Sequence, residues 1–191
     1  MKTKAILALL IAGTMGFTAC NSKIDEKTLS EINQFGTDWT ALGEQASTWS
    51  QQLTETATQA KEFAAKQSEM VATTANIKDE AMKAKIAEMA QSATANSEKL
   101  ESMTTEWNSF KTTWDETTTQ FTEWKEKVAK GEIKPADAVK GLADFKTKMS
   151  DAQARFESWN TAYAETKTSC DQNMAAADEL AKSIENPSAK K

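Results

Sequence analysis

A seven-residue repeat of uncharged residues runs through most of the chain and restricts the folds open to it. Alternate steps of three and four residues over positions 32–74, 82–128 and 138–184 meet no Asp, Glu, Lys or Arg. We call these positions the seam. A repeat that averages 3.5 residues is typical of α-helices that wind around one another with a left-handed twist. The seam therefore predicts three long helices whose uncharged sides face a shared core.

The repeat loses its phase at two places, and residues near each break are typical of helix ends. Asp79 suits the cap of a second helix, and Gly131 suits the left-handed position that ends it. Pro135 fits the first turn of a third helix, which Pro187 ends. Short connections between helices of similar length favour an all-α, extended, antiparallel three-helix coiled coil with up-down-up order. The helices are expected at about residues 25–75, 78–129 and 135–185.

Every aromatic residue after position 20 lies on the seam. Antiparallel alignment predicts that Trp39 lies beside Trp114 and that Trp107 lies beside Trp159. The aromatic layers then occupy the middle of the bundle and the end where the first helix begins, whereas seam positions within residues 60–100 and 166–180 are mostly Ala, Met, Thr, Asn and Gln. Stripes at helical spacing normally face partner helices. We therefore expect a packed core that leaves no aromatic face for stacking on sugars or nucleobases.

The composition excludes several classes of function. The chain has no His, 6 Gly, 2 Pro and 2 Cys, so imidazole zinc sites, His-based catalytic triads, Gly-rich phosphate loops and disulfide frameworks lack their residues. The formal net charge is −5, and basic residues are dispersed among acids, which is typical of a solvated surface. We predict that the chain is not an enzyme, holds no metal or cofactor, and binds no nucleic acid.

The first residues resemble the signal peptide of a bacterial lipoprotein. Two lysines precede an apolar run over residues 5–15, which is shorter than a membrane-spanning helix. The next segment, Phe17-Thr18-Ala19-Cys20, resembles the lipobox of that family. The resemblance implies cleavage between Ala19 and Cys20, a diacylglycerol on the Cys20 thiol and an acyl chain such as palmitate on the new amine. The alternative is an ordinary secretory signal that leaves Cys20 free.

The residues after Cys20 bear on the destination of the protein. Asn21 follows the cysteine, which by resemblance to the sorting rule of Gram-negative lipoproteins favours the outer membrane. Residues 23–26 are similar to a surface-export signal of some lipoproteins, and a solvated tether is the alternative, so the periplasmic or surface face stays open. The predicted divisions are a signal peptide at 1–19, a lipidated tether at 20–24, a three-helix domain at 25–186 and a disordered tail at 187–191.

The seam includes one cysteine and two asparagines. Cys170 suits a core that takes a small, weakly polar side chain, so we predict a buried, reduced thiol in a mostly monomeric protein. The alternative is a Cys170 disulfide that links two molecules. Asn96 and Asn173 are expected to fix the register of the helices at a cost in stability.

Val71 and Ile77 are large apolar residues outside the seam, and they flank the expected turn between the first two helices. They form the candidate patch for a protein partner at the end of the bundle far from Cys20. The alternative is that they only pin the turn.

These features predict a lipid-anchored, rod-like structural or protein-interaction module of the bacterial cell envelope. Its expected partners are the membrane, through the lipid, and an envelope protein. Long helical envelope lipoproteins resemble it in architecture. The alternative is a carrier of lipid or another hydrophobic ligand that uses the Trp-rich seam.

Overall fold

The computed structural model describes residues 23–74 and 77–185 and shows an all-α three-helix bundle. The predicted fold class is confirmed. Helix α1 spans Glu26–Thr73, α2 spans Glu80–Ala129 and α3 spans Pro135–Glu185. The lipobox and the predicted tail at residues 187–191 lie outside the described residues.

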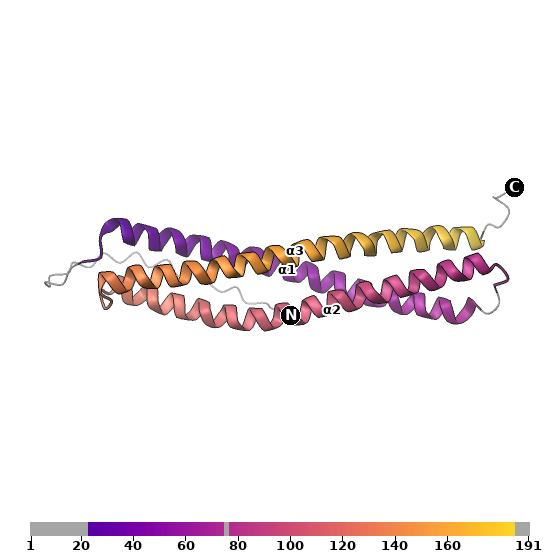
Figure 1. The fold of residues 1–191 in the computed structure, drawn as a ribbon, viewed down its shortest axis with the longest axis horizontal. Coiled ribbons are helices and arrows are strands. Elements are labelled where there is room, and N and C mark those ends of the chain that lie inside the picture. The colour runs from indigo at the N-terminus through magenta and orange to yellow at the C-terminus, as the bar shows by residue number, and fades with distance from the viewer. Residues whose placement is uncertain (1–22, 75–76, 186–191) are drawn as a thin grey trace, which may run out of the picture.

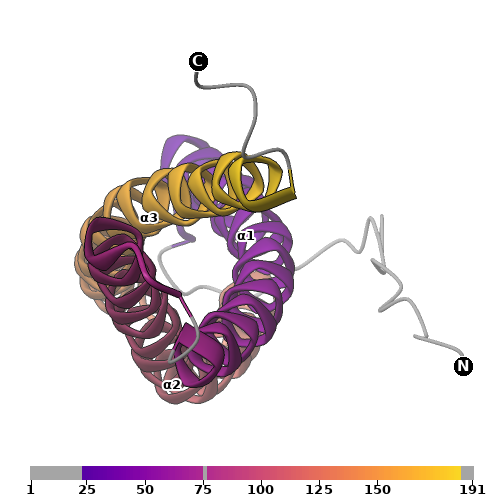
Figure 2. The same cartoon turned by 90° about the vertical axis from the view of Figure 1, so that its right-hand side faces the viewer.

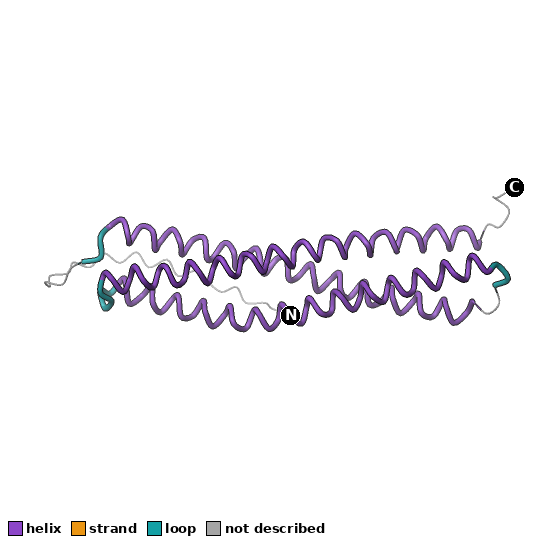
Figure 3. Tube along the Cα trace, in the orientation of Figure 1, coloured by secondary structure: helices purple, strands orange, loops and turns teal. Residues whose placement is uncertain are grey.

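The three helices lie side by side along a narrow rod (Figure 1). Helix α2 runs antiparallel to α1 and α3, so the interhelical turns lie at opposite ends (Figure 3). We call the end with Glu26 and the α2–α3 turn the proximal end, and the end with the α1–α2 turn the distal end. Viewed along the rod, the helices form a triangle (Figure 2). At about 1.5 Å per residue, helices of this size span about 75 Å.

Aspartates cap the first two helices. Asp25 Oδ1 accepts a hydrogen bond from the backbone N–H of Thr28 at 2.9 Å, and Asp25 Oδ2 accepts one from the Thr28 hydroxyl at 2.7 Å. These bonds favour the carboxylate, the backbone bond most strongly, and lower the pKa of Asp25. Asp79 Oδ1 accepts from the backbone N–H groups of Ala81 and Met82. Both caps satisfy donors that the start of a helix leaves unpaired.

The turn between α2 and α3 follows from a glycine and a proline. Gly131 has a φ of 71°, in the left-handed region that glycine adopts without a steric penalty. Its N–H donates to the Val128 carbonyl at 3.0 Å, and the Glu132 N–H donates to the Lys127 carbonyl at 2.9 Å. This pair of bonds is the Schellman arrangement. Pro135 is the first residue of α3, where its missing N–H costs no helical bond.

The seam forms the core of the bundle. No seam residue whose side chain the structure describes is exposed. Trp39 stacks on Trp114 with 4.3 Å between the ring centroids, and Trp107 meets Trp159 edge-on at 6.0 Å. Both predicted aromatic neighbours are confirmed. Because these rings come from different helices, they fix the antiparallel alignment that the seam predicts.

The core is divided into two clusters of unequal size. The main cluster holds the described aromatic layers and extends to Cys170. The distal cluster consists of four buried residues, namely Ile86, Met89, Ala177 and Leu180. Near this cluster Gln67 is 3% exposed, and its Oε1 has no hydrogen-bond partner among the described residues. The distal cluster buries far fewer apolar side chains than the main cluster, so the distal end is the less stable part of the bundle.

Two helical glycines give opposite predictions for the same substitution. A Cβ on Gly141 would lie 2.8 Å from Cε2 of Trp124, whereas the nearest atom to a Cβ on Gly43 would be Trp114 Nε1 at 3.8 Å. Gly43→Ala should raise the free energy of unfolding by about 0.8–1 kcal/mol, because alanine favours a helix. Gly141→Ala should lower it by about 1–3 kcal/mol through overpacking. Urea unfolding measures both changes, and stabilisation by both substitutions would contradict the packing of Trp124.

Candidate functional site

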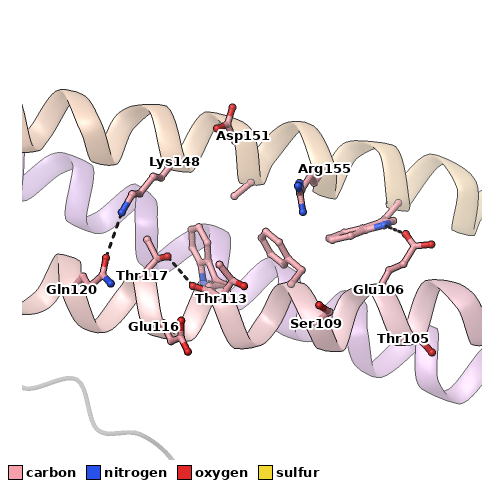
Figure 4. A pocket seen from close by; sticks show the side chains of 14 residues that line it. Thr105, Glu106, Ser109, Thr113, Glu116, Thr117, Gln120, Lys148, Asp151 and Arg155 are labelled. Carbon is pink, nitrogen blue, oxygen red and sulfur yellow. Dashed lines mark hydrogen bonds between the residues drawn. The ribbon is translucent and has the colours of Figure 1, made fainter.

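A groove of about 750 Å³ lies between α2 and α3 in the proximal half of the bundle (Figure 4). Its lining includes three seam rings, those of Phe110, Trp114 and Trp159. All three side chains are half-buried. The prediction that the seam leaves no aromatic face accessible is therefore wrong at these three positions.

The groove opens where large side chains of α2 face a small side chain of α3. Helix α1 packs more closely against α2 than α3 does. Trp114 stacks on Trp39 of α1 and also on Phe110, with 6.1 Å between the last two ring centroids. Besides Trp159, the seam residue that α3 contributes to the lining is Ala152. Its methyl group leaves the space between the two helices unfilled.

Helix α3 directs two cations toward α2 across the groove, as Figure 4 shows for Lys148 and Arg155. Lys148 Nζ donates to Gln120 Oε1 at 3.4 Å and lies 5.2 Å from the centroid of the Phe145 ring. Arg155 is the single arginine of the sequence. Within residues 23–74 and 77–185, its guanidinium has no ion pair or hydrogen bond. The groove therefore holds one cation that already has contacts and one that is free to bind a ligand.

Three carboxylates also line the groove, but none of them forms an ion pair with Arg155. Glu106 Oε2 accepts a hydrogen bond from Trp159 Nε1 at 3.1 Å, which ties α2 to α3. Figure 4 shows Asp151 and Glu116 directed away from the space between the helices. Within the described residues, Arg155 is therefore an exposed cation at the groove without an ion pair. The Glu106 carboxylate accepts from the neutral Trp159 and Ser102 side chains and keeps its own charge.

Sequence reasoning did not single out Arg155, Lys148 or Glu106. Lys148 and Arg155 are seven residues apart, which places them on one side of a helix. Ala152, a small seam residue, lies between them. A gap in the seam flanked by two cations is the pattern that could have located the groove.

The two seam asparagines make matching hydrogen bonds between α2 and α3. Asn96 Nδ2 donates to Ser169 Oγ at 2.9 Å, and Asn173 Nδ2 donates to Ser92 Oγ at 2.9 Å. We call these four residues the amide–hydroxyl pairs. The serines lie outside the seam, so the repeat alone did not indicate them. The bonds give each half-buried amide nitrogen a partner and match one antiparallel register of α2 and α3.

Cys170 lies in the main core cluster and is 3% exposed. Burial raises the pKa of its thiol, and the nearby Asp171 carboxylate adds to the shift. Because the thiolate is the form that reacts, we expect native protein to react slowly with a thiol reagent at neutral pH, and unfolded protein to react fast. A Cys20→Ser background isolates the reaction of Cys170. Equal rates with and without urea would contradict the burial of this thiol.

Four predicted site residues remain: Val71 and Ile77 near the α1–α2 turn, and Ala19 and Cys20, which precede α1 in the sequence. Val71 and Ile77 are half-buried, and both pack against the distal cluster. The Ile77 N–H donates to the Thr74 carbonyl at 2.9 Å, which closes the end of α1. Ala19 and Cys20, the predicted cleavage and lipidation residues, lie outside the described residues.

Comparisons of the chain with protein-family models, with curated proteins and with solved structures found no match. In the part of the chain that the structure describes, no group of three or more His, Cys, Asp or Glu side chains is placed to hold a metal ion. None of the three described helices is long and apolar enough to cross a membrane.

Proposed function

We propose that the protein is a lipid-anchored lipoprotein of the bacterial envelope that acts as a rod-like structural or protein-interaction module. The observation that carries this proposal is that the bundle has two distinct ends. The predicted lipidation site, Cys20, precedes Glu26, which starts α1 at the proximal end. The α1–α2 turn lies at the opposite end of the rod (Figure 1).

The packing of the side chains supports a role as a rigid rod. The aromatic layers join all three helices in the proximal half, through contacts such as Trp39 with Trp114 and Trp49 with Phe156. The amide–hydroxyl pairs continue these links toward the distal end. A lipid on Cys20 would thus hold one end at a membrane while the bundle carries the other end about 75 Å away, at 1.5 Å per residue.

Fatty-acid labelling in the host bacterium tests the anchor. The chain has 2 cysteines, so each can be replaced separately and the two variants compared. The wild-type protein should take up an alkynyl fatty acid and sediment with the outer membrane, as the Asn21 rule predicts. Cys20→Ser should abolish both labelling and sedimentation. Cys170→Ser is the matched control and should behave like the wild type. Labelling of Cys20→Ser at the wild-type level would refute the lipoprotein proposal.

Photo-crosslinking tests the role of the distal end. Lys78 and Lys134 are exposed residues in the two interhelical turns, distal and proximal respectively. A photoreactive amino acid at position 78 should crosslink an envelope protein, and the same residue at position 134 should crosslink lipid or proteins at the anchoring membrane. The same products from both positions would argue against a module that presents its distal end to a partner.

A second candidate function is the carriage of a hydrophobic ligand. Most rings of the seam are packed against each other, but Phe110, Trp114 and Trp159 line an open groove. This groove gives such a ligand a place to bind that does not require the core to open.

A further inference from the structure

We propose that the α2–α3 groove binds a flat, apolar organic anion, that is, a fused or aromatic ring system with one carboxylate, sulfonate or sulfate group. The juxtaposition that carries this inference is an aromatic wall beside an unpaired guanidinium. The site lies wholly within α2 and α3, so the inference does not depend on the lipid anchor.

The ring contacts favour a flat ligand. Phe110 lies at the centre of the aromatic wall, 6.1 Å from Trp114 and 5.2 Å from Trp159 between ring centroids. The three side chains are half-buried, so each keeps some surface toward the groove. Aromatic side chains prefer offset-stacked or edge-to-face contacts with other rings. A ring system that enters the groove would extend a stack that the protein has already begun.

The positive charge of Arg155 favours an anionic group on that ligand. Arg155 points into the groove in Figure 4, and its guanidinium has no ion pair or hydrogen bond within the described ranges. A guanidinium presents paired N–H donors that match the two oxygens of a carboxylate or sulfonate. Lys148, two helical turns away on the same side of α3, adds positive potential at the proximal end of the groove.

None of the three carboxylates of the lining forms an ion pair with Arg155. Glu106 is held by the Trp159 indole N–H at 3.1 Å, and Asp151 and Glu116 are directed away from the groove in Figure 4. The volume of about 750 Å³ also falls within the range of about 300–1,000 Å³ that is typical of small-molecule sites. Size and shape therefore suit a flat ring system, and the Arg155 guanidinium provides the local contact for its anionic group.

Two fluorescent probes with the same rings separate the contribution of charge from that of stacking. Anilinonaphthalene sulfonate carries a sulfonate, and phenylnaphthylamine has the same ring system without it. Titrations use the full chain with Cys20→Ser, so that no attached acyl chain competes for the groove. We expect saturable binding of the sulfonate at one site per chain, and weaker binding of the uncharged probe. Naphthoate should displace the sulfonate probe, whereas decanoate, an anion without rings, should not.

Substitutions in this background place the probe in the groove. Arg155→Gln should weaken binding of the sulfonate about fivefold, the upper end of what one exposed ion pair contributes, and should leave the uncharged probe unaffected. Lys140→Gln removes an exposed cation of α3 outside the groove and should change neither affinity. Circular dichroism should show the same helix content for both variants.

Three results would overturn the proposal. One is equal affinity of Arg155→Gln and the parent for the sulfonate probe. Another is an equal loss of affinity in Lys140→Gln, which would mean that general charge and not the groove attracts the probe. The third is displacement by decanoate as effective as that by naphthoate, which would rule out selection for flat rings.

Discussion

Trp49→Ala should lower the free energy of unfolding by about 3–5 kcal/mol, the usual cost of removing a large aromatic side chain from a core. Trp49 is 4% exposed. It belongs to α1, and rings from both other helices surround it at centroid distances of 5.4–6.3 Å. Those rings belong to Trp107, Phe156, Trp159 and Tyr163. Since no other large ring of α1 touches this layer, the resulting cavity cannot close without moving a whole helix.

Trp49→Phe is the matched control for this prediction. The indole Nε1 of Trp49 is buried and has no hydrogen-bond partner in the described ranges. Phenylalanine keeps a ring in the layer and removes the unpaired donor, so the two effects oppose one another. We expect a change in the free energy of unfolding within about 1.5 kcal/mol. Urea unfolding followed by circular dichroism measures both variants, and an equal loss in both would show that ring packing is not what stabilises this layer.

Ile86→Ala should cost about 2–5 kcal/mol locally and open the distal end of the bundle. Ile86 is 0% exposed and belongs to the distal cluster, which contains no aromatic residue among its buried members. With this side chain removed, the cluster keeps Met89, Ala177 and Leu180 as its buried residues. Amide hydrogen exchange should therefore accelerate at the distal ends of α2 and α3, while amides beside the aromatic layers keep their protection.

Leu100→Ala provides the comparison within α2. Leu100 is also 0% exposed but belongs to the main cluster. Its loss should weaken the protection of all three helices, because the main cluster joins them along most of the rod. If Ile86→Ala and Leu100→Ala gave the same pattern of exchange, the division of the core into two units would be wrong.

The sequence was sufficient for the architecture because a strict repeat leaves few choices. A seam without charges defines one apolar side on each helix, and Asp79, Gly131 and Pro135 are residues that favour helix ends and lie where the repeat breaks. Antiparallel order then follows from the short turns. The pairing of Trp39 with Trp114 was predictable from the same alignment.

The groove was not predictable, because the repeat treats all three interfaces as equivalent. Whether a seam ring is covered depends on the volume of the residue that faces it from the next helix. Large rings on α2 lie near Ala152 of α3, and this mismatch becomes visible only when the helices are placed in three dimensions. The direction of Arg155 likewise depends on its rotamer and neighbours and not on its position in the repeat.

The amide–hydroxyl pairs have a mechanical consequence. A heptad repeat permits neighbouring helices to slip by seven residues and still bury apolar side chains. Such a slip of α3 along α2 would place Asn96 opposite Ala162 or Ala176 in place of Ser169. The half-buried amide would then lose its hydrogen bond to Ser169, and a bond of this kind contributes about 0.5–1.5 kcal/mol to stability. The two bonds therefore oppose sliding of α3 along α2. Under tension along its axis, the bundle should keep its length because these helices hold their register.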